Sequence, residues 1–322
     1  MRAIVRTEYG SADVIELVER ELPEPKAKQV RVRVEAAGVD IGVWHMMTGL
    51  PSMMRPVTGL PRPRQPRLGS ELAGVVDAVG AEVVRFSPGD LVFGTGTGTF
   101  AEYAIAAEKN LVLRSAGVSA QAAAASAISG LTAFQALNPM RAAMGRVLVL
   151  GASGGVGSFA VQIAKAFHGH VTGVASTDKL EFVTSLGADE VLDYTAVDPT
   201  DGSRSYDLIL DMGGNRPLHE LRRALTPRGR AVIVGGEGGG RVTGGFFRGM
   251  TAGAASALRR QKISGLISTT TVQGLVDVDT LLASGEVTAA IDRVYPLAET
   301  AEAVRRLQSR QVRGKLVIDT TK

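Results

Sequence analysis

The chain of 322 residues contains no cysteine. This absence excludes disulfides, thiolate nucleophiles and every cysteine-ligated zinc or iron–sulfur site. Four histidines remain as possible ligands or bases, and two of them, His168 and His170, flank a glycine after a predicted helix. We expect those two to be helix-end residues rather than metal ligands. The sequence therefore predicts no metal site.

Long hydrophobic runs and strong charge of one sign are also missing. No apolar run is long enough to span a bilayer, and residues 1–8 lack the apolar core of a signal peptide. The formal net charge is only +4, and no basic helix or basic stripe interleaved with aromatics occurs, which argues against a nucleic-acid partner. We expect a cytoplasmic protein with a small-molecule substrate and no membrane or nucleic-acid partner.

The most informative segment that is present is a glycine-rich turn. Four apolar residues, 147–150, precede it, and a helical pattern follows over 158–167. A buried strand, a tight turn and a helix start together place unpaired backbone N–H groups against a pyrophosphate. The segment predicts a dinucleotide cofactor. Its expected contacts are Ala152, Ser153, Gly154, Gly155, Val156 and Gly157.

The chain divides into two patterns near residue 119. Before it, short alternating strands such as 30–35, 73–79 and 91–93 are typical of a β-rich domain. After it, a helix at 120–127 leads into alternating strands and helices, which predict a doubly wound parallel sheet with its ligand at the carboxyl ends of the strands. The expected later strands and helix are 146–150, 171–175, 190–192, 208–211, 231–235, an edge strand at 263–267, a helix at 300–308 and a strand at 315–318.

Residues 51–67 are rich in proline and arginine: they hold five of the 13 prolines and four arginines. Proline at this density argues against a helix or a central strand. We therefore expect an exposed loop. It is either a solvated connector or the anion-attracting rim of a cleft.

Six ordered motifs make nearly the whole chain resemble the medium-chain dehydrogenase/reductase superfamily, in its zinc-independent quinone oxidoreductase branch. They are Ala36–Asp40, Leu68–Val76, Gly130–Ala133, Ala152–Gly157, Leu186–Asp189 and Gly314–Ile318. The resemblance implies an α/β fold with a GroES-like β-barrel catalytic domain (1–121) and a doubly wound parallel-sheet Rossmann domain (122–270). Segment 271–322 would complete the catalytic domain, with the active site between the two domains.

The resemblance also bears on metal binding. Zinc-dependent relatives carry a Gly-His-Glu motif and an upstream cysteine, and these positions here are Gly69-Ser70-Glu71 and Asp40. Asp40 and Glu71 alone do not assemble a tetrahedral zinc site of nitrogen and sulfur ligands. We therefore expect no metal-assisted alcohol oxidation. A zinc-free enzyme similar to alcohol dehydrogenases remains an alternative.

The identity of the dinucleotide depends on the end of the second strand of the parallel sheet. Ser176 stands about 20 residues past the fingerprint, where an NAD-binding site places Asp or Glu. Its hydroxyl and the ammonium of Lys179 suit a 2′-phosphate, so we expect NADPH. Asp178 keeps recognition of a free ribose open as the alternative.

Four more residues are expected near the cofactor. By the resemblance, Thr132 lies near the nicotinamide ribose or phosphate, and Tyr194 flanks the adenosine end unless it is a strand-end aromatic. Gly213 and Gly235 follow strand ends, where the backbone approaches a cofactor closely, although packing alone would also favour glycine there.

Direct hydride delivery to an activated carbon is the simplest chemistry for a chain without a metal, a cysteine or a flavin signature. Quinones and α,β-unsaturated carbonyl compounds are such acceptors. The catalytic candidates have competing interpretations: Asp40 orients the nicotinamide ribose or donates to the substrate oxygen, Trp44 walls the acceptor site or fills the core, and His45 supplies a proton or is structural.

We therefore predict an NADPH-dependent quinone or enone reductase. Its alternative is a non-enzymatic NADPH-binding protein of the same fold. Because the segment 263–267 has the pattern of an edge strand, and because such a strand pairs with its twin in dimeric relatives, we also expect a homodimer.

Overall fold

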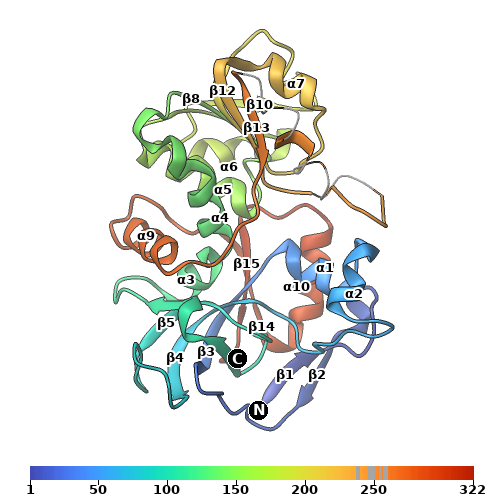
Figure 1. The fold of residues 1–322 in the computed structure, drawn as a ribbon, viewed down its shortest axis with the longest axis vertical. Coiled ribbons are helices and arrows are strands. Elements are labelled where there is room, and N and C mark those ends of the chain that lie inside the picture. Colours follow the sequence, from blue (N-terminus) through green and yellow to red (C-terminus); the bar gives the residue numbers. More distant parts are fainter. Residues whose placement is uncertain (237–239, 246–247, 249–250, 254–255, 257–259) are drawn as a thin grey trace. The chain divides into compact units, whose positions relative to one another are not determined.

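The computed structural model describes residues 1–236, 240–245, 248, 251–253, 256 and 260–322. These residues form two compact units. Unit 1 combines Met1–Leu131 with Thr270–Lys322, and unit 2 is Thr132–Thr269. Each unit is built on its own sheet (Figure 1).

Unit 1 contains a seven-stranded sheet. Its order is β14-β15-β3-β4-β5-β7, with β6 paired to β3. All pairs are antiparallel except β14 with β15. The strands are β3 (Gln29–Val39), β4 (Glu71–Val79), β5 (Leu91–Thr95), β6 (Tyr103–Ala107), β7 (Leu111–Leu113), β14 (Ile291–Pro296) and β15 (Lys315–Asp319).

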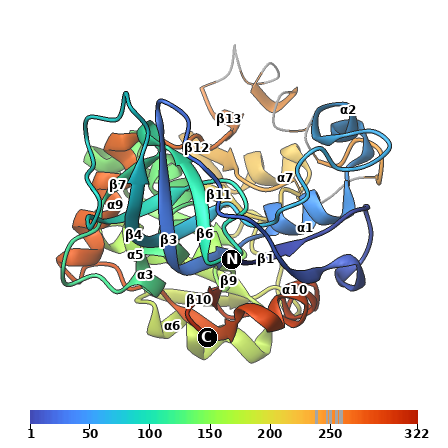
Figure 2. The same ribbon diagram turned by 90° about the horizontal axis from the view of Figure 1, so that it is seen from below.

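A smaller sheet and several helices complete unit 1. Strands β1 (Arg2–Val5) and β2 (Glu16–Glu19) pair with each other in antiparallel fashion. The final helix α10 packs against α1 and the short helix η1, on the side seen in Figure 2. The helices are α1 (Ile41–Thr48), α2 (Arg55–Thr58), α3 (Ala120–Ser126), α9 (Val272–Ala283) and α10 (Thr300–Gln308), with short helices η1 (Ala12–Val14), η2 (Ser52–Met54), η3 (Glu108–Asn110) and η6 (Leu297–Glu299).

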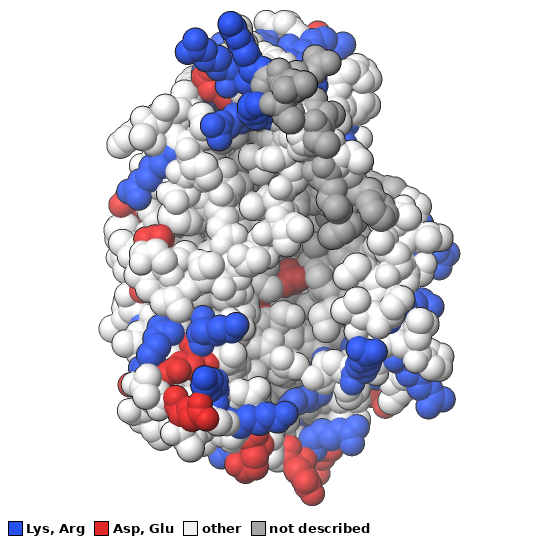
Figure 3. All heavy atoms as spheres, viewed as in Figure 1, with Lys and Arg blue, Asp and Glu red and all other residues white. Residues whose placement is uncertain are grey.

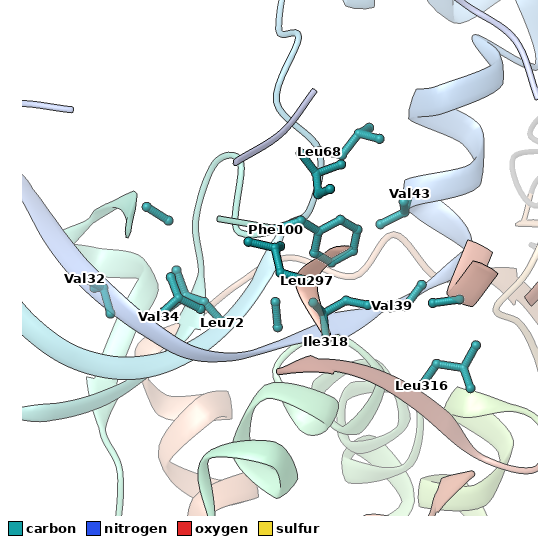
Figure 4. Close-up of a cluster of buried hydrophobic side chains, with 14 of the residues drawn as sticks. Val32, Val34, Val39, Val43, Leu68, Leu72, Phe100, Leu297, Leu316 and Ile318 are labelled. Carbon is teal, nitrogen blue, oxygen red and sulfur yellow. The ribbon is translucent and has the colours of Figure 1, made fainter. Parts of the chain in front are cut away.

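The core of unit 1 follows from the alternation that the sequence shows. Val30, Val32 and Val34 of β3 are buried, because alternate residues of a strand point to one face. Figure 4 shows Val32 and Val34 in one cluster with side chains from β4, β15 and the segment before β6. Burying each such side chain contributes about 1.5–3 kcal/mol.

The boundary between the units differs from the predicted one. The prediction placed it after residue 121, within α3. In the structure α3 packs against β3, β4 and β15, and the boundary falls after Leu131, within α4 (Ser129–Leu137). The alanine-rich sequence of α3 gives a helix but does not specify which sheet covers it.

Unit 2 has a six-stranded parallel sheet in the order β10-β9-β8-β11-β12-β13. Numbered along the chain, this is the order 3-2-1-4-5-6 of a doubly wound nucleotide-binding sheet. The predicted α/β class is confirmed, and β13 is the predicted edge strand. The elements are β8 (Arg146–Leu150), β9 (His170–Ala175), β10 (Glu190–Asp193), β11 (Tyr206–Asp211), β12 (Leu225–Ile233), β13 (Lys262–Gly265), α5 (Gly155–Ala166), α6 (Leu180–Ser185), α7 (Leu218–Arg223), η4 (Asn138–Ala143) and η5 (Thr177–Lys179).

The proline- and arginine-rich segment 51–67 is not entirely loop, which corrects the prediction. It contains η2 and α2, and Pro56 occupies one of the first two positions of α2, where its missing N–H removes no helical hydrogen bond. The segment is also anchored. The guanidinium of Arg55 lies 4.8 Å from the ring centroid of Tyr9, whose hydroxyl donates to the carbonyl of Gly59.

Among the residues described above, none of the helices combines the length and apolar character needed to cross a bilayer.

Candidate functional site

The glycine turn of unit 2 connects β8 to α5. Gly151 has a φ of 82°, a left-handed conformation that favours glycine. A Cβ on Gly157 would lie only 2.1 Å from the carbonyl oxygen of Gly151, so glycine allows the helix to start against the strand. The helix begins at Gly155 without a side-chain cap. Its first N–H groups are thus left for a ligand, as pyrophosphate binding requires.

The turn lies where the strand order of the sheet reverses. β8 and β11 are neighbours, and the chain proceeds outward from them in opposite directions. In doubly wound sheets, ligands bind outside the carboxyl ends of the strands at this point. The N–H of Ala152 donates to the carbonyl of Val174 in β9 at 3.0 Å. This bond fixes the turn, and with it Ser153, Gly154 and Val156, at the carboxyl edge.

The residues predicted to decide the choice of cofactor follow β9. The Ser176 hydroxyl donates to Oδ1 of Asp178 at 2.5 Å, so a carboxylate lies directly beside the predicted phosphate contact. Lys179 is only 8% exposed. The hydroxyl of Ser176 suits a 2′-phosphate and the carboxylate of Asp178 suits a free ribose diol. Whether the site prefers a 2′-phosphate or a free ribose therefore depends on Ser176 and Asp178, whose side chains are bonded to each other.

The remaining cofactor candidates differ in how strongly packing explains them. A Cβ on Gly235 would lie 1.8 Å from the carbonyl oxygen of Met212, so packing alone requires that glycine. A Cβ on Gly213 meets only the Asn215 amide, at 3.7 Å, which leaves room for a ligand. Tyr194 is 56% exposed just after β10, and Thr132 is buried on α4.

An ion pair that the sequence analysis missed lies at the end of β11. Asp211 is 3% exposed; its Oδ1 accepts the N–H of Gly214 at 3.0 Å, and its Oδ2 lies 3.6 Å from Nη2 of Arg248. Burial raises the pKa of Asp211, whereas Arg248 lowers it. The sequence did offer one indication of this ion pair, because Asp211 is an acidic residue at the end of a strand predicted to be buried.

The three catalytic candidates lie together at α1 in unit 1. Asp40 is the N-cap: its Oδ1 accepts the N–H of Gly42 at 2.6 Å, and its Oδ2 is buried without a hydrogen-bond partner. The rings of Trp44 and His45 meet edge to face, with centroids 4.9 Å apart. His45 Nδ1 lies 2.7 Å from the carbonyl of Leu50. Because a carbonyl oxygen can only accept, Nδ1 carries a proton and donates it to this bond, and Nε2 is left for other partners.

Trp44 contacts the core, and Asp40 has a role that the sequence analysis missed. Trp44 is partly buried and packs against the core of unit 1. Asp40 caps a helix, as Asp commonly does at this position. The signal for the cap was the Asp residue placed directly before a helical pattern.

Unit 1 also contains a buried ion pair that the sequence analysis did not predict. Lys315 Nζ lies 2.5 Å from Glu71 Oε2 and donates to Ser129 Oγ at 3.1 Å. Glu71 is fully buried and Lys315 is 2% exposed. Burial raises the pKa of Glu71 to about 7; the charge of Asp40 also raises it, while Lys315 lowers it.

The donor set around Ser70 does not fit a catalytic zinc ion. Such an ion takes nitrogen, sulfur or carboxylate ligands. Glu71 is already bonded to Lys315 and to the backbone N–H of Ile128, and Oδ1 of Asp40 caps α1. Across the described ranges, no group of three or more His, Cys, Asp or Glu side chains is arranged to hold a metal.

The predicted residues therefore form two sets. Those for the cofactor, from Thr132 to Gly235, all belong to unit 2. Asp40, Trp44 and His45 all belong to unit 1. In unit 1 the three candidates lie at α1. In unit 2 the glycine turn and Ser176 follow the neighbouring strands β8 and β9.

The chain matches two protein families along its length. Residues 26–116 match the alcohol dehydrogenase GroES-like domain. Residues 186–318 match a family described as zinc-binding dehydrogenase, although the donor set above does not suit zinc.

Curated relatives are similar over nearly the whole chain. The chain is 31% identical to the chloroplast envelope quinone oxidoreductase homolog of Arabidopsis thaliana, over 99% of this chain and 98% of the relative. It is 32% identical to the quinone oxidoreductase of Pseudomonas aeruginosa, over 96% and 97%. It is also 31% identical to the 2-methylene-furan-3-one reductase of Solanum lycopersicum, over 99% and 79%.

Solved structures show the same fold. The quinone oxidoreductase from Coxiella burnetii superimposes with a TM-score of 0.86 at 26% identity, over 99% of both chains. The Escherichia coli quinone oxidoreductase complexed with NADPH gives a TM-score of 0.83 at 24% identity, over 99% of this chain and 100% of that one.

The raised pKa of Glu71 predicts a pH-dependent stability. The folded state holds a proton on Glu71 up to about pH 7, whereas the unfolded chain releases it near pH 4.5. The stabilisation that this proton gives to the folded state is therefore fully present below pH 4.5 and is lost as the pH rises through 7. We expect the free energy of unfolding to fall between pH 5 and pH 8, by at most about 3 kcal/mol.

Urea unfolding at several pH values measures this slope. The double variant Glu71→Gln with Lys315→Met, which lacks both ionisable groups, should show a shallower slope. Equal slopes in the wild type and the double variant would contradict the prediction.

Proposed function

Because the chain belongs to the medium-chain dehydrogenase/reductase superfamily, in its quinone oxidoreductase branch, we propose that it is an NADPH-dependent reductase of quinones or α,β-unsaturated carbonyl compounds. The observation that carries the proposal is the uncapped start of α5 at the switch point of a 3-2-1-4-5-6 sheet. Similarity to quinone and enone reductases over nearly the full chain supports the acceptor class.

Unit 2 is the proposed cofactor domain. The backbone of Gly154, Gly155 and Val156 would hold the pyrophosphate, with Thr132 and Gly213 nearer the nicotinamide end. When bound, NADPH supplies a hydride. We propose that unit 1 is the catalytic domain and that no zinc takes part, because the donor set of Asp40, Ser70 and Glu71 does not fit that metal.

Unit 1 contributes the proposed groups that act on the acceptor. Reduction of a conjugated carbonyl or a quinone leaves negative charge on an oxygen, which a proton donor must neutralise. His45, as an imidazolium with a proton on both ring nitrogens, is the proposed donor through Nε2, since the Leu50 carbonyl already accepts the proton on Nδ1. Trp44 is the proposed wall for a planar acceptor, and Asp40 holds the start of α1 that carries both.

The proposed partners are small molecules and a second copy of the chain. On the face seen in Figure 3, Lys and Arg side chains lie in separate groups rather than in one stripe, which does not favour a nucleic-acid partner. The edge strand β13 has a neighbour on only one side in the described sheet, and such an edge can pair with an identical strand. A cytoplasmic location is proposed from the sequence alone.

Turnover is the first test of this function. Purified protein should oxidise NADPH when quinones and enones are added, and dialysis against a chelator should leave the rate unchanged. Binding of NADPH without turnover of any acceptor would favour the non-enzymatic alternative. Turnover of simple alcohols in place of these acceptors would favour an enzyme similar to alcohol dehydrogenases.

Cofactor choice is tested at the Ser176–Asp178 pair. We expect Ser176→Asp to lower the NADPH/NADH preference about tenfold, because a second carboxylate repels a 2′-phosphate. The matched variant Asp178→Asn should raise the preference. The preference is the ratio of kcat/KM for the two cofactors, and an unchanged ratio in both variants would exclude a 2′-phosphate at this position.

Association through β13 predicts a dimer at micromolar concentration. Sedimentation velocity should give twice the chain mass. Changing Ile263, in the middle of β13, is unsuitable because that side chain is buried. Ser264→Lys places a charge at an exposed position of the edge strand, which disfavours pairing of edges, and should shift the protein toward monomer. A wild-type monomer would exclude this assembly.

A further inference from the structure

The start of α4 lacks a cap from its own sequence. α3 ends at Ser126 and α4 begins at Ser129, and the residue before that start is Ile128, whose side chain offers no acceptor. The first N–H groups of a helix need partners when they are buried. Glu71 supplies one from β4: its Oε1 accepts the N–H of Ile128 at 2.7 Å and that of Ser129 at 3.4 Å.

The capping carboxylate is built into the fold. Above the pKa of Glu71, about 7, Lys315 of β15 balances the carboxylate charge at 2.5 Å, and Lys315 also binds the Ser129 hydroxyl. Gly38 of β3 makes the space, since a Cβ there would lie 2.2 Å from Oε2 of Glu71. β3, β4, β15 and the α3–α4 junction are thus joined by one group of side chains. A carboxylate at a helix N-terminus is also favoured by the helix dipole.

A role in positioning explains this arrangement better than a role in stability. Replacing a buried ion pair with apolar side chains of similar volume is often neutral or stabilising. The pair here makes directional bonds to two groups of one helix turn, Ile128 and Ser129. Those bonds fix where α4 starts and how it is rotated. Thr132 follows Ser129 by about one helical turn, so its side-chain position depends on that start.

We propose that Glu71 is a positioning residue for the cofactor: its side-chain acceptor, next to Lys315, fixes the first turn of α4 and, through it, Thr132. The inference rests on the proposed function, in which Thr132 lies near the nicotinamide end of NADPH. Small displacements matter at such a contact, since about 1 Å can cost a factor of about 100 in rate.

Two matched double variants separate the cap from the charge pair. In Glu71→Gln with Lys315→Met, the amide oxygen still accepts the Ile128 N–H although both charges are gone. In Glu71→Met with Lys315→Met, the charges and the acceptor are both gone. We expect the dissociation constant of NADPH, from nicotinamide fluorescence, to stay within about twofold of wild type in the first and to rise about tenfold in the second.

Coupling to Thr132 distinguishes positioning from a general loss of stability. Thr132→Ala should weaken NADPH binding in the wild type and in the Gln-containing variant. Thr132→Ala should weaken NADPH binding little further in the double variant with Glu71→Met, where Thr132 is already displaced. Thermal midpoints and circular dichroism check that both variants fold. Equal NADPH affinities in the two double variants, or a fully additive effect of Thr132→Ala, would overturn the proposal.

Hydrogen exchange reports on the cap without the cofactor. The Ile128 amide should exchange slowly in the wild type and in the double variant with Glu71→Gln. It should exchange faster in the double variant with Glu71→Met. Slow exchange in all three proteins would overturn the capping role. A wild-type protein that binds neither NADPH nor NADH would instead overturn the proposed function and the assignment to the cofactor, and the exchange data would still show whether Glu71 caps α4.

Discussion

A carboxylate buried away from water must find donors where it lies, and in unit 1 this requirement connects distant parts of the chain. Glu71 is fully buried, and its partners come from β15 and from the α3–α4 junction. Without Lys315 or the N–H groups of the α3–α4 junction, the charge of Glu71 would lie in a low-dielectric surrounding without enough partners. The C-terminal segment therefore belongs to unit 1 for an electrostatic reason as well as a hydrophobic one.

Unit 2 depends on a different constraint, the close approach of backbone to backbone. Gly157 fits against the backbone of Gly151 only because Gly157 has no side chain. For the same reason Gly235 fits against the backbone of Met212. Steric necessity at Gly157 also brings the first N–H groups of α5 to the carboxyl edge of the sheet. Gly157 thus serves packing, and in the proposed function the same close approach leaves the first N–H groups of α5 for the pyrophosphate.

Much of the fold was predictable because it depends on local pattern. The alternation of Val30, Val32 and Val34 fixes a strand with one buried face, and the apolar run before Gly151 fixes the central strand of unit 2. The predicted domain boundary after residue 121 differs from the boundary of the two compact units, since an alanine-rich run does not indicate which sheet α3 covers. The short helix α2 was also missed, because proline density outweighed its permitted position in the first helical turn.

The candidate site was predictable in its backbone and less so in its side chains. The glycine fingerprint locates the turn, but the bond between Ser176 and Asp178 depends on rotamers that no sequence pattern specifies. Glu71 and Lys315 each stood within a recognised motif, yet they lie 244 positions apart in the chain. Pairs at such separation are defined by the tertiary fold.

The absence of histidine and cysteine from residues 68–76 limits the chemistry that unit 1, as the proposed catalytic domain, can perform. A zinc ion polarises a carbonyl oxygen as a Lewis acid, and the groups around Ser70 are already used: Asp40 for capping α1 and Glu71 for capping α4. Glu71 is not free to hold a metal without giving up a helix start, and Asp40, whose Oδ2 has no hydrogen-bond partner, cannot alone supply the three protein ligands of a catalytic zinc site. An acceptor that needs little polarisation, because conjugation already spreads its developing charge, suits a site whose carboxylates are committed to structure.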